Sequence, residues 1–538
     1  MDLFVLSSWI KFSLFIFPIW WAGTLVIRFL IDEVRFEVLY PLGLFAGTLF
    51  YLVLLNSLSF IFGPQISQYL SFFLVMLISI TILKFSKLSK ISYLRGKSLL
   101  LFLFSSLFFI IPLFWVIGKT LLGADVEIFY SIAKTFSRGN FPMVTPWQPD
   151  LFLTYHYGIS ILIGAINGLT NLKLDFILLA LSLFYIFCLI QSFIWIWKRH
   201  DKIFSLLLYF LIPSLTLFSV GTMMLVIPSF PIELTKNLEI LNLPTAHKSF
   251  ETYGGAVVDL NGHVYFFHHL VGLVITWLLI VLCTNIQRKR FLFRVITVAI
   301  CLIGFALINE AFFILSIFFV IASFIYFEIK QKSLKKDVIP LFLIGLVSLL
   351  IILFQGGVIT GYILNRHKGL EQSVIIFPKI SDYPEGLAAV DNLRGYRAGQ
   401  QSTHIFKENF LFKSKWYQLG VSWLLGIFII LIIILWKYID IKKKFTLLFF
   451  LSTSVFSILA YNTVIPIYVP ANGNRFLTMC YQFLGLGLST SVVFLFDLLL
   501  NKNASQSGGT VARFAAENTA SQSQYSRPVS SLKIVNFT

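Results

Sequence analysis

Long runs of hydrophobic residues alternate with short polar segments along almost the whole chain, from Phe12 to Leu498. An apolar helix of about 20 residues matches the hydrocarbon thickness of a bilayer, so each run predicts a membrane-crossing helix. A further run, Tyr157–Leu169, is short for a span and is expected to be re-entrant or to lie at the surface. The predicted spans, about thirteen in number, are Phe12–Leu30, Val38–Ile61, Ile66–Leu83, Ser98–Ile117, Leu174–Trp197, Ile203–Ile227, Val264–Ile286, Phe291–Leu307, Phe312–Tyr326, Val338–Val358, Leu419–Trp436, Phe445–Val464 and Phe476–Leu498.

The predicted fold is therefore all-α, a polytopic integral membrane protein with its membrane domain over residues 1–499. The tail, residues 500–538, is rich in Ser, Ala, Gln and Gly and is expected to be disordered and cytoplasmic. No cleavable signal peptide is expected, because the first residues lack a basic start and a small-residue cleavage site. The first span is expected to be retained.

Basic residues cluster in the loops between spans and predict the orientation of the chain. Because cytoplasmic loops carry an excess of Lys and Arg, all clusters fall on the cytoplasmic side if Tyr157–Leu169 does not cross. An undetected break elsewhere is the competing explanation. Three large loops then lie on the outer face, at residues 119–156, 228–263 and 362–418. The five clusters are Lys84/Lys87/Lys90/Arg95/Lys97, Lys198/Arg199/Lys202, Arg288/Lys289/Arg290/Arg294, Lys330/Lys332/Lys335/Lys336 and Lys437/Lys442/Lys443/Lys444.

Composition supports the same class. With 58% hydrophobic and 12% charged residues, the chain does not have the composition of a soluble domain. The net charge of +18 sits in short loops, as topology signals do, and does not indicate nucleic-acid binding. All four cysteines fall in apolar segments without metal or disulfide spacing, so they are expected to be packing residues.

The loop 119–156 is predicted to contain a short helix followed by an extended segment. Asp125 is expected to be the N-cap of a short amphipathic helix, and Gly139 is expected to end it. Such a helix would lie along the membrane surface. Three prolines then predict an extended, turning path. The predicted apolar face consists of Val126, Phe129, Ala133 and Phe136.

Three motifs in this region carry a resemblance: Asp125-x-Glu127, the turn Arg138-Gly139-Asn140-Phe141-Pro142, and Thr154-Tyr155-His156-Tyr157-Gly158. In this order they resemble the first extracytoplasmic loop of the GT-C superfamily. These polytopic glycosyltransferases take a sugar from a polyprenyl-phosphate carrier and include protein mannosyltransferases and lipid A aminoarabinose transferases. The chain departs from the family in two ways: three spans precede the usual first one, and Val126 separates the two acids.

The resemblance implies that Asp125 or Glu127 accepts the proton of an acceptor hydroxyl. The alternative is that Asp125 only caps its helix and Glu127 is solvated. The departing lipid phosphate needs cations, and Arg binds phosphate oxygens in a bidentate way. The candidates are Arg475, Arg138, Arg394 and Arg397, with interfacial anchoring or simple solvation as the alternative.

Further candidates for substrate or phosphate binding are Glu310, His156 and His263. The alternative for Glu310 is that it only caps the start of the following helix, where negative charge is favoured. The alternative for His156 is that it is an anchor at the membrane interface. The spacing of His263, His268 and His269 does not place all three on one helical face, so no metal site is expected. No cofactor is expected either, because the chain has no phosphate-binding loop or dinucleotide turn.

The expected function is transfer of a sugar from a polyprenyl-phosphate donor to a hydroxyl acceptor of an envelope glycan, lipid or protein. The expected location is a bacterial inner membrane, with the site facing outward. The alternatives are a transporter or flippase of a lipid-linked or anionic substrate, an envelope polysaccharide polymerase or ligase, and a family member that binds glycolipid without turnover.

Overall fold

The computed structural model describes residues 3–31, 33–85, 90–92, 124–145, 148–153, 157–197, 267–284, 290–331, 334–365, 415–462, 480, 483–496 and 498–499. Two predicted spans, Ser98–Ile117 and Ile203–Ile227, lie outside these residues. So do the predicted loop 228–263, most of the loop 362–418 and the tail 500–538.

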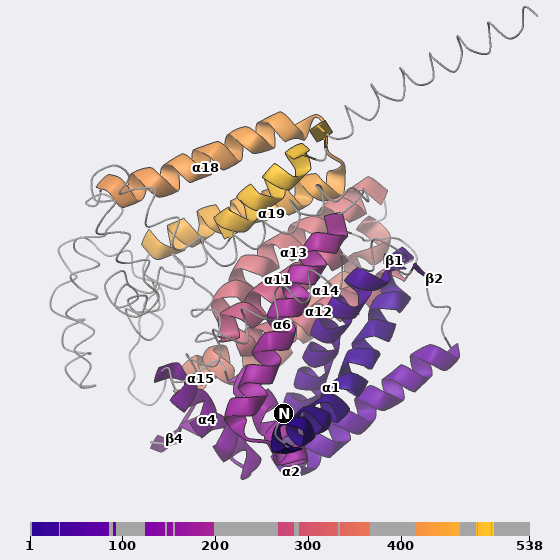
Figure 1. The fold of residues 1–538 in the computed structure, drawn as a ribbon, viewed down its shortest axis with the longest axis vertical. Helices are drawn as coiled ribbons and strands as arrows, with labels where there is room; N and C mark the ends of the chain where they lie inside the picture. Colours follow the sequence, from indigo (N-terminus) through magenta and orange to yellow (C-terminus); the bar gives the residue numbers. More distant parts are fainter. Residues whose placement is uncertain are drawn as a thin grey trace, which may run out of the picture.

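The described chain is overwhelmingly helical, and each of the other predicted spans contains a helix (Figure 1). The helices are α1 (Leu3–Leu30), α2 (Phe36–Phe85), α4 (Ala124–Ser137), α5 (Gly158–Thr170), α6 (Leu174–Trp197), α11 (Phe267–Thr284), α12 (Phe291–Ile308), α13 (Glu310–Gln331), α14 (Leu334–Phe354), α15 (Gly357–Asn365), α18 (Lys415–Trp436), α19 (Ile441–Asn462) and the apolar helix Phe483–Phe496. Short strands, which were not predicted, are β1 (Glu33–Arg35), β2 (Lys90–Ser92), β3 (Val144–Thr145) and β4 (Gln148–Phe152). β1 pairs with β2 in parallel and β3 with β4 antiparallel.

Glycines decide where two of the long helices break. α2 is interrupted at Gly63, which has φ 73 and precedes Pro64, so the two spans predicted on either side are separate helices. The predicted span Val338–Val358 is wrong at its end, because α14 stops at Phe354 and α15 begins at Gly357. Between them Gly356 has φ 100, a conformation that costs glycine little and other residues much.

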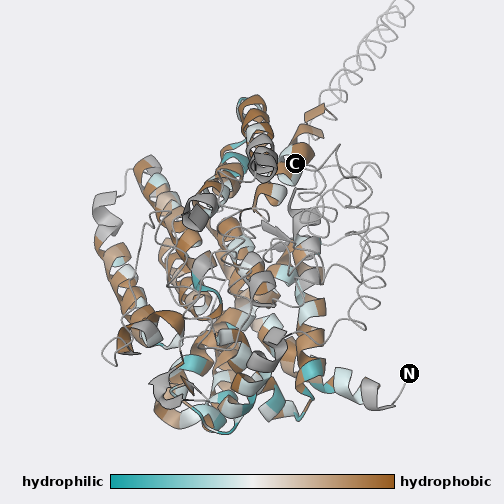
Figure 2. Cartoon of the chain, turned by 90° about the vertical axis from the view of Figure 1, so that its left-hand side faces the viewer, coloured by the Kyte–Doolittle hydropathy of each residue, from teal (hydrophilic) through white to brown (hydrophobic). Residues whose placement is uncertain are grey.

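By length and composition, three helical segments among the described residues could cross a membrane: Leu6–Leu30, Phe291–Ile308 and Val38–Lys84, the last of which contains the break at Gly63. α5 has 13 residues and is therefore about 20 Å long, well short of a bilayer core of about 30 Å. It meets α6 at an angle of 118°, the geometry of a broken span or a re-entrant loop. Figure 2 shows the described helices mostly hydrophobic along their length, as in a membrane protein.

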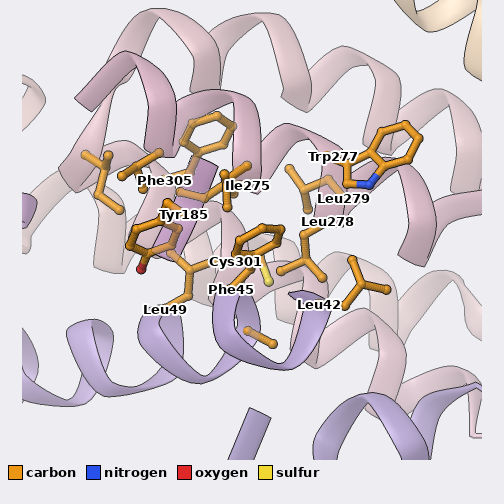
Figure 3. Close-up of a cluster of buried hydrophobic side chains, with 14 of the residues drawn as sticks. Leu42, Phe45, Leu49, Tyr185, Ile275, Trp277, Leu278, Leu279, Cys301 and Phe305 are labelled. Carbon is orange, nitrogen blue, oxygen red and sulfur yellow. The ribbon is translucent and has the colours of Figure 1, made fainter. Parts of the chain in front are cut away.

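Small residues bring α1 and α2 into close backbone contact. A Cβ on Gly23 would lie 1.9 Å from the Gly43 carbonyl oxygen, and one on Gly47 would lie 2.0 Å from the Ile19 carbonyl oxygen. Gly43 and Gly47 are four residues apart on α2, the spacing by which small residues let apolar helices approach. Around this pair the core is continuous, with α2, α6, α11 and α12 all contributing side chains to the cluster in Figure 3.

One end of the bundle, here called the basic end, gathers lysines and arginines. Arg290 and Arg294, at the start of α12, donate to the carbonyl oxygens of Phe29 and Leu30 at the end of α1. Since these carbonyls have no partner within their own helix, the arginines satisfy them. The Phe291 ring stacks on Phe327 near the end of α13.

Further contacts extend the basic end. Tyr326 of α13 packs edge to face on Phe445 near the start of α19, at 4.8 Å between ring centroids. The β1–β2 pairing places Lys90 opposite Glu33, directly beyond α1. Residues of four of the five predicted basic clusters therefore share one end, and the Lys198 cluster lies outside the described residues.

Candidate functional site

The predicted amphipathic helix exists as α4, and it carries both candidate acids in its first turn. α4 begins at Ala124, so Asp125 is inside the helix and is not its N-cap, which corrects the prediction. Negative charge in a first turn is still favoured by the helix dipole. Gly139, with φ 100, ends the helix as predicted, and its N–H donates to the Phe136 carbonyl at 2.9 Å. The side chains of Asp125 and Glu127 lie outside the description.

The apolar face of α4 packs on protein. Ile132, Ala133 and Phe136 are fully buried, which confirms Ala133 and Phe136 of the predicted face. The partner is α5, where a Cβ on Gly164 would lie 2.7 Å from the Ala133 carbonyl oxygen. This burial against α5 replaces the expected contact with the membrane surface over the second half of the helix.

Tyr130 joins α4 to the start of α6. Burial, together with the neighbouring carboxylate of Asp175, raises the pKa of the Tyr130 hydroxyl. Asp175 lies in the first turn of α6, so α4 contacts the start of α6 as well as α5.

The turn after α4 is held by side chains. The Asn140 amide donates to the Val144 carbonyl at 3.3 Å, and its oxygen accepts the Val144 N–H at 3.4 Å. The Phe141 ring packs on Phe136 of α4 and, at 4.6 Å between ring centroids, on Phe60 beside the break in α2. Arg138 is exposed in this turn. An extended, turning path was expected after the turn, and the structure has the β3–β4 hairpin there, with Pro142 before β3 and Pro149 within β4.

A buried polar cluster fixes the start of α5, and it is here called the tyrosine node: Asn56, Tyr157 and Gln355. The Tyr157 hydroxyl lies 2.9 Å from the Gln355 carbonyl oxygen and 3.2 Å from Asn56 Oδ1. Asn56 Nδ2 donates to the same Gln355 carbonyl at 2.9 Å. The Gln355 side chain in turn donates to the Ile303 carbonyl of α12 at 3.0 Å. One buried cluster thus joins α2, α5, α12 and the α14–α15 break.

The Asn309-Glu310 pair lies beside the same point. A Cβ on Gly158 would lie 3.0 Å from the Leu307 carbonyl oxygen, so the start of α5 touches the end of α12. Asn309 Oδ1 accepts the N–H of Phe312 at 3.2 Å, which makes Asn309 the N-cap of α13. The side-chain cap is therefore Asn309 and not Glu310. Glu310 is half-buried and follows the cap in the first turn, where negative charge is favoured, as the alternative expected.

The end of the bundle that contains the tyrosine node, α4 and the α12–α13 junction is here called the polar end. α15 and β4 lie beside α4 there (Figure 1). The first turn of α11, with His268 and His269, belongs to it too, because Gly272 packs on the Phe312 ring. Of the predicted site residues, the structure places Arg138, Glu310 and the backbones of Asp125 and Glu127 at this end. The others, Arg475, Arg394, Arg397, His156 and His263, lie outside the described residues.

The tyrosine node was not predicted from the sequence. Asn56 and Gln355 are amides inside or at the end of apolar runs, where a polar side chain must find a partner. That signal was available, but it could not name the partner, because Asn56 and Gln355 are 299 residues apart.

Within the described residues no group of three His, Cys, Asp or Glu side chains could hold a metal ion. The cysteines Cys188, Cys283, Cys301 and Cys480 are all buried and free, in line with a packing role. Comparisons with family models, curated proteins and solved structures found no match. Fold and site therefore define a helical protein with long apolar helices, typical of membrane proteins, and a polar cluster at one end.

Proposed function

We propose that this protein is a multi-pass membrane glycosyltransferase that moves a sugar from a polyprenyl-phosphate carrier to a hydroxyl acceptor. The observation that carries the proposal is the position of α4. Its acid-bearing first turn belongs to a unit, α4 to α5, that is tied by Tyr157 to Asn56 and Gln355. Reacting groups must be held on a rigid, supported element, and the anchoring of α4 on α5 supports the proposal in this respect.

In the proposed step, one carboxylate at the start of α4 accepts the proton of the acceptor hydroxyl. The hydroxyl oxygen then forms a bond to the anomeric carbon, while the bond from that carbon to the phosphate oxygen breaks. The departing lipid phosphate takes the electron pair and needs cations beside it. Among the described residues, the candidate for this cation is Arg138, which is exposed and directly follows α4. Arg475, Arg394, Arg397, His156 and His263 remain candidates from the sequence.

The setting supports a lipid-linked donor. The site lies at the polar end, opposite the basic end, and an excess of basic residues is typical of the cytoplasmic side. The polar end then faces outward, across a bacterial inner membrane in our proposal. A donor whose tail stays in the bilayer reaches such a site without a nucleotide-binding domain. Holding donor and acceptor together removes much of the entropic barrier to their meeting.

The test is release of sugar from radiolabelled polyprenyl-phosphate sugars by the purified full-length protein. Asp125→Asn is expected to lower turnover about a hundredfold or more while donor binding persists. Glu127→Gln tests the second acid, and Asp440→Asn is the matched control, because Asp440 is an acid at a helix start at the basic end and Asn also serves as an N-cap. If wild type consumes no donor, or if Asp125→Asn matches the control, the transferase proposal fails.

A further inference from the structure

The turn between α18 and α19 is rich in lysine and has no part in the proposed glycosyltransferase reaction. It runs from Trp436 to Lys444 and holds four lysines and a single acid. Lys437 and Lys442 are exposed, and Lys444 is half-exposed with its Nζ 5.0 Å above the Trp436 ring. The turn lies at the basic end, since Phe445 packs on Tyr326 near the end of α13.

The residues beside these lysines divide into aromatic and aliphatic zones. Tyr438 is 64% exposed and Trp436 41% exposed, both within two residues of Lys437. On the α18 side, Ile430, Ile433 and Ile434 are exposed as well. Tryptophan and tyrosine favour the headgroup level of a bilayer and isoleucine its hydrocarbon. This order places the lysine ammonium groups at the level of the lipid phosphates.

The two remaining charges of the turn have structural roles. The Asp440 carboxylate accepts the backbone N–H of Lys443 at 3.0 Å and so caps the start of α19. Lys443 is buried, with its Nζ 4.6 Å above the Phe494 ring of the helix Phe483–Phe496. The lysines at 437, 442 and 444 are thus the ones presented to the surroundings, and they lie on a turn held by a cap and by packing.

We propose that this turn binds the headgroups of anionic phospholipids in the leaflet at the basic end. Three lysines on a capped turn complement the negative phosphates, while Trp436 and the α18 isoleucines contact the glycerol and acyl region. The proposal rests on the membrane setting alone and is independent of the transferase activity. Its failure and that of the transferase proposal are therefore separable.

The experiment measures binding of a fluorescent short-chain phosphatidylglycerol to the purified full-length protein in detergent, with phosphatidylcholine of the same chain length as reference. Wild type is expected to prefer phosphatidylglycerol by about tenfold or more at low salt. The preference is expected to shrink as salt is added, because exposed charges are screened. The triple variant K437Q/K442Q/K444Q is expected to lose most of it, whereas K437R/K442R/K444R is expected to keep it.

The matched control is K11Q/K134Q/K173Q, which removes the same charge from exposed lysines at the polar end. It is expected to leave the preference unchanged. Equal loss in this control would overturn the proposal, because the preference would then follow net charge and not the turn. Absence of any preference in wild type would overturn it too. Displacement of the lipid by soluble glycerol phosphate at comparable concentration would instead indicate a free-anion site and refute lipid recognition.

Discussion

Replacing Gly356 with alanine tests the tyrosine node directly. A Cβ at this position would lie 1.9 Å from the Tyr157 hydroxyl oxygen and 2.9 Å from Cζ of the same ring. Either the ring or the α14–α15 break must move, which costs about 1–3 kcal/mol as overpacking. The backbone φ of 100 adds about 1–2 kcal/mol for a residue other than glycine. We therefore expect G356A to lower the free energy of unfolding by about 2–5 kcal/mol.

The measurement is equilibrium unfolding of the full-length protein in mixed micelles, followed by tryptophan fluorescence. Gly345→Ala is the matched control: Gly345 lies inside α14, and a Cβ there meets no atom within 4 Å. This variant is expected to be neutral, or to gain up to about 1 kcal/mol of stability from helix propensity. A comparable loss in both variants would mean that the effect belongs to α14 in general.

A double mutant isolates the contact itself. Tyr157→Phe removes the hydroxyl that lies closest to the new methyl group, at a cost of about 1 kcal/mol for the lost hydrogen bond. In the Y157F background, G356A is expected to cost less than in wild type by about 1 kcal/mol or more, since the worst overlap is gone. Strict additivity of the two substitutions would refute the geometry described for the node.

Three further outcomes are expected. Gly47→Leu is expected to destabilise the protein by more than about 2 kcal/mol in the same unfolding assay, because the new side chain would meet the α1 backbone. Gly426→Leu is the control and is expected to be tolerated, because a Cβ at Gly426 has no atom within 4 Å. Asn309→Ala is expected to lower stability by about 1 kcal/mol through loss of the α13 cap, and Asn309→Asp by much less. Equal losses of stability in thermal melts of the two variants would contradict the capping role. The raised pKa of Tyr130 favours the neutral phenol in the folded state, so this contribution to stability is full below the ordinary pKa of 10.0 and falls as pH rises above it. Tyr130→Phe is expected to flatten that alkaline loss, and unfolding curves of both proteins across alkaline pH check it.

The sequence predicted local structure well where an apolar run or a glycine decides it. The bounds of α6, Leu174–Trp197, agree with the predicted span, and Gly139 ends α4 as expected. These features depend on residues close together in the chain, because helix hydrogen bonds and caps join positions a few residues apart. Of the candidate site, the helix α4 was predicted, but the α5 contact that buries its apolar face was not.

Tertiary structure alone decided which faces meet. In a lipid-exposed bundle nearly every face of a helix is apolar, so hydrophobic periodicity does not tell packing faces from lipid-facing ones. The approach of Gly43 and Gly47 to α1, and the meeting of Tyr157 with Asn56 and Gln355, depend on close backbone fit and on pairing of buried polar groups. The sequence by itself determined where the helices run and where they stop. Partners 101 and 198 residues away decided where the start of α5 is held, and with it the proposed site.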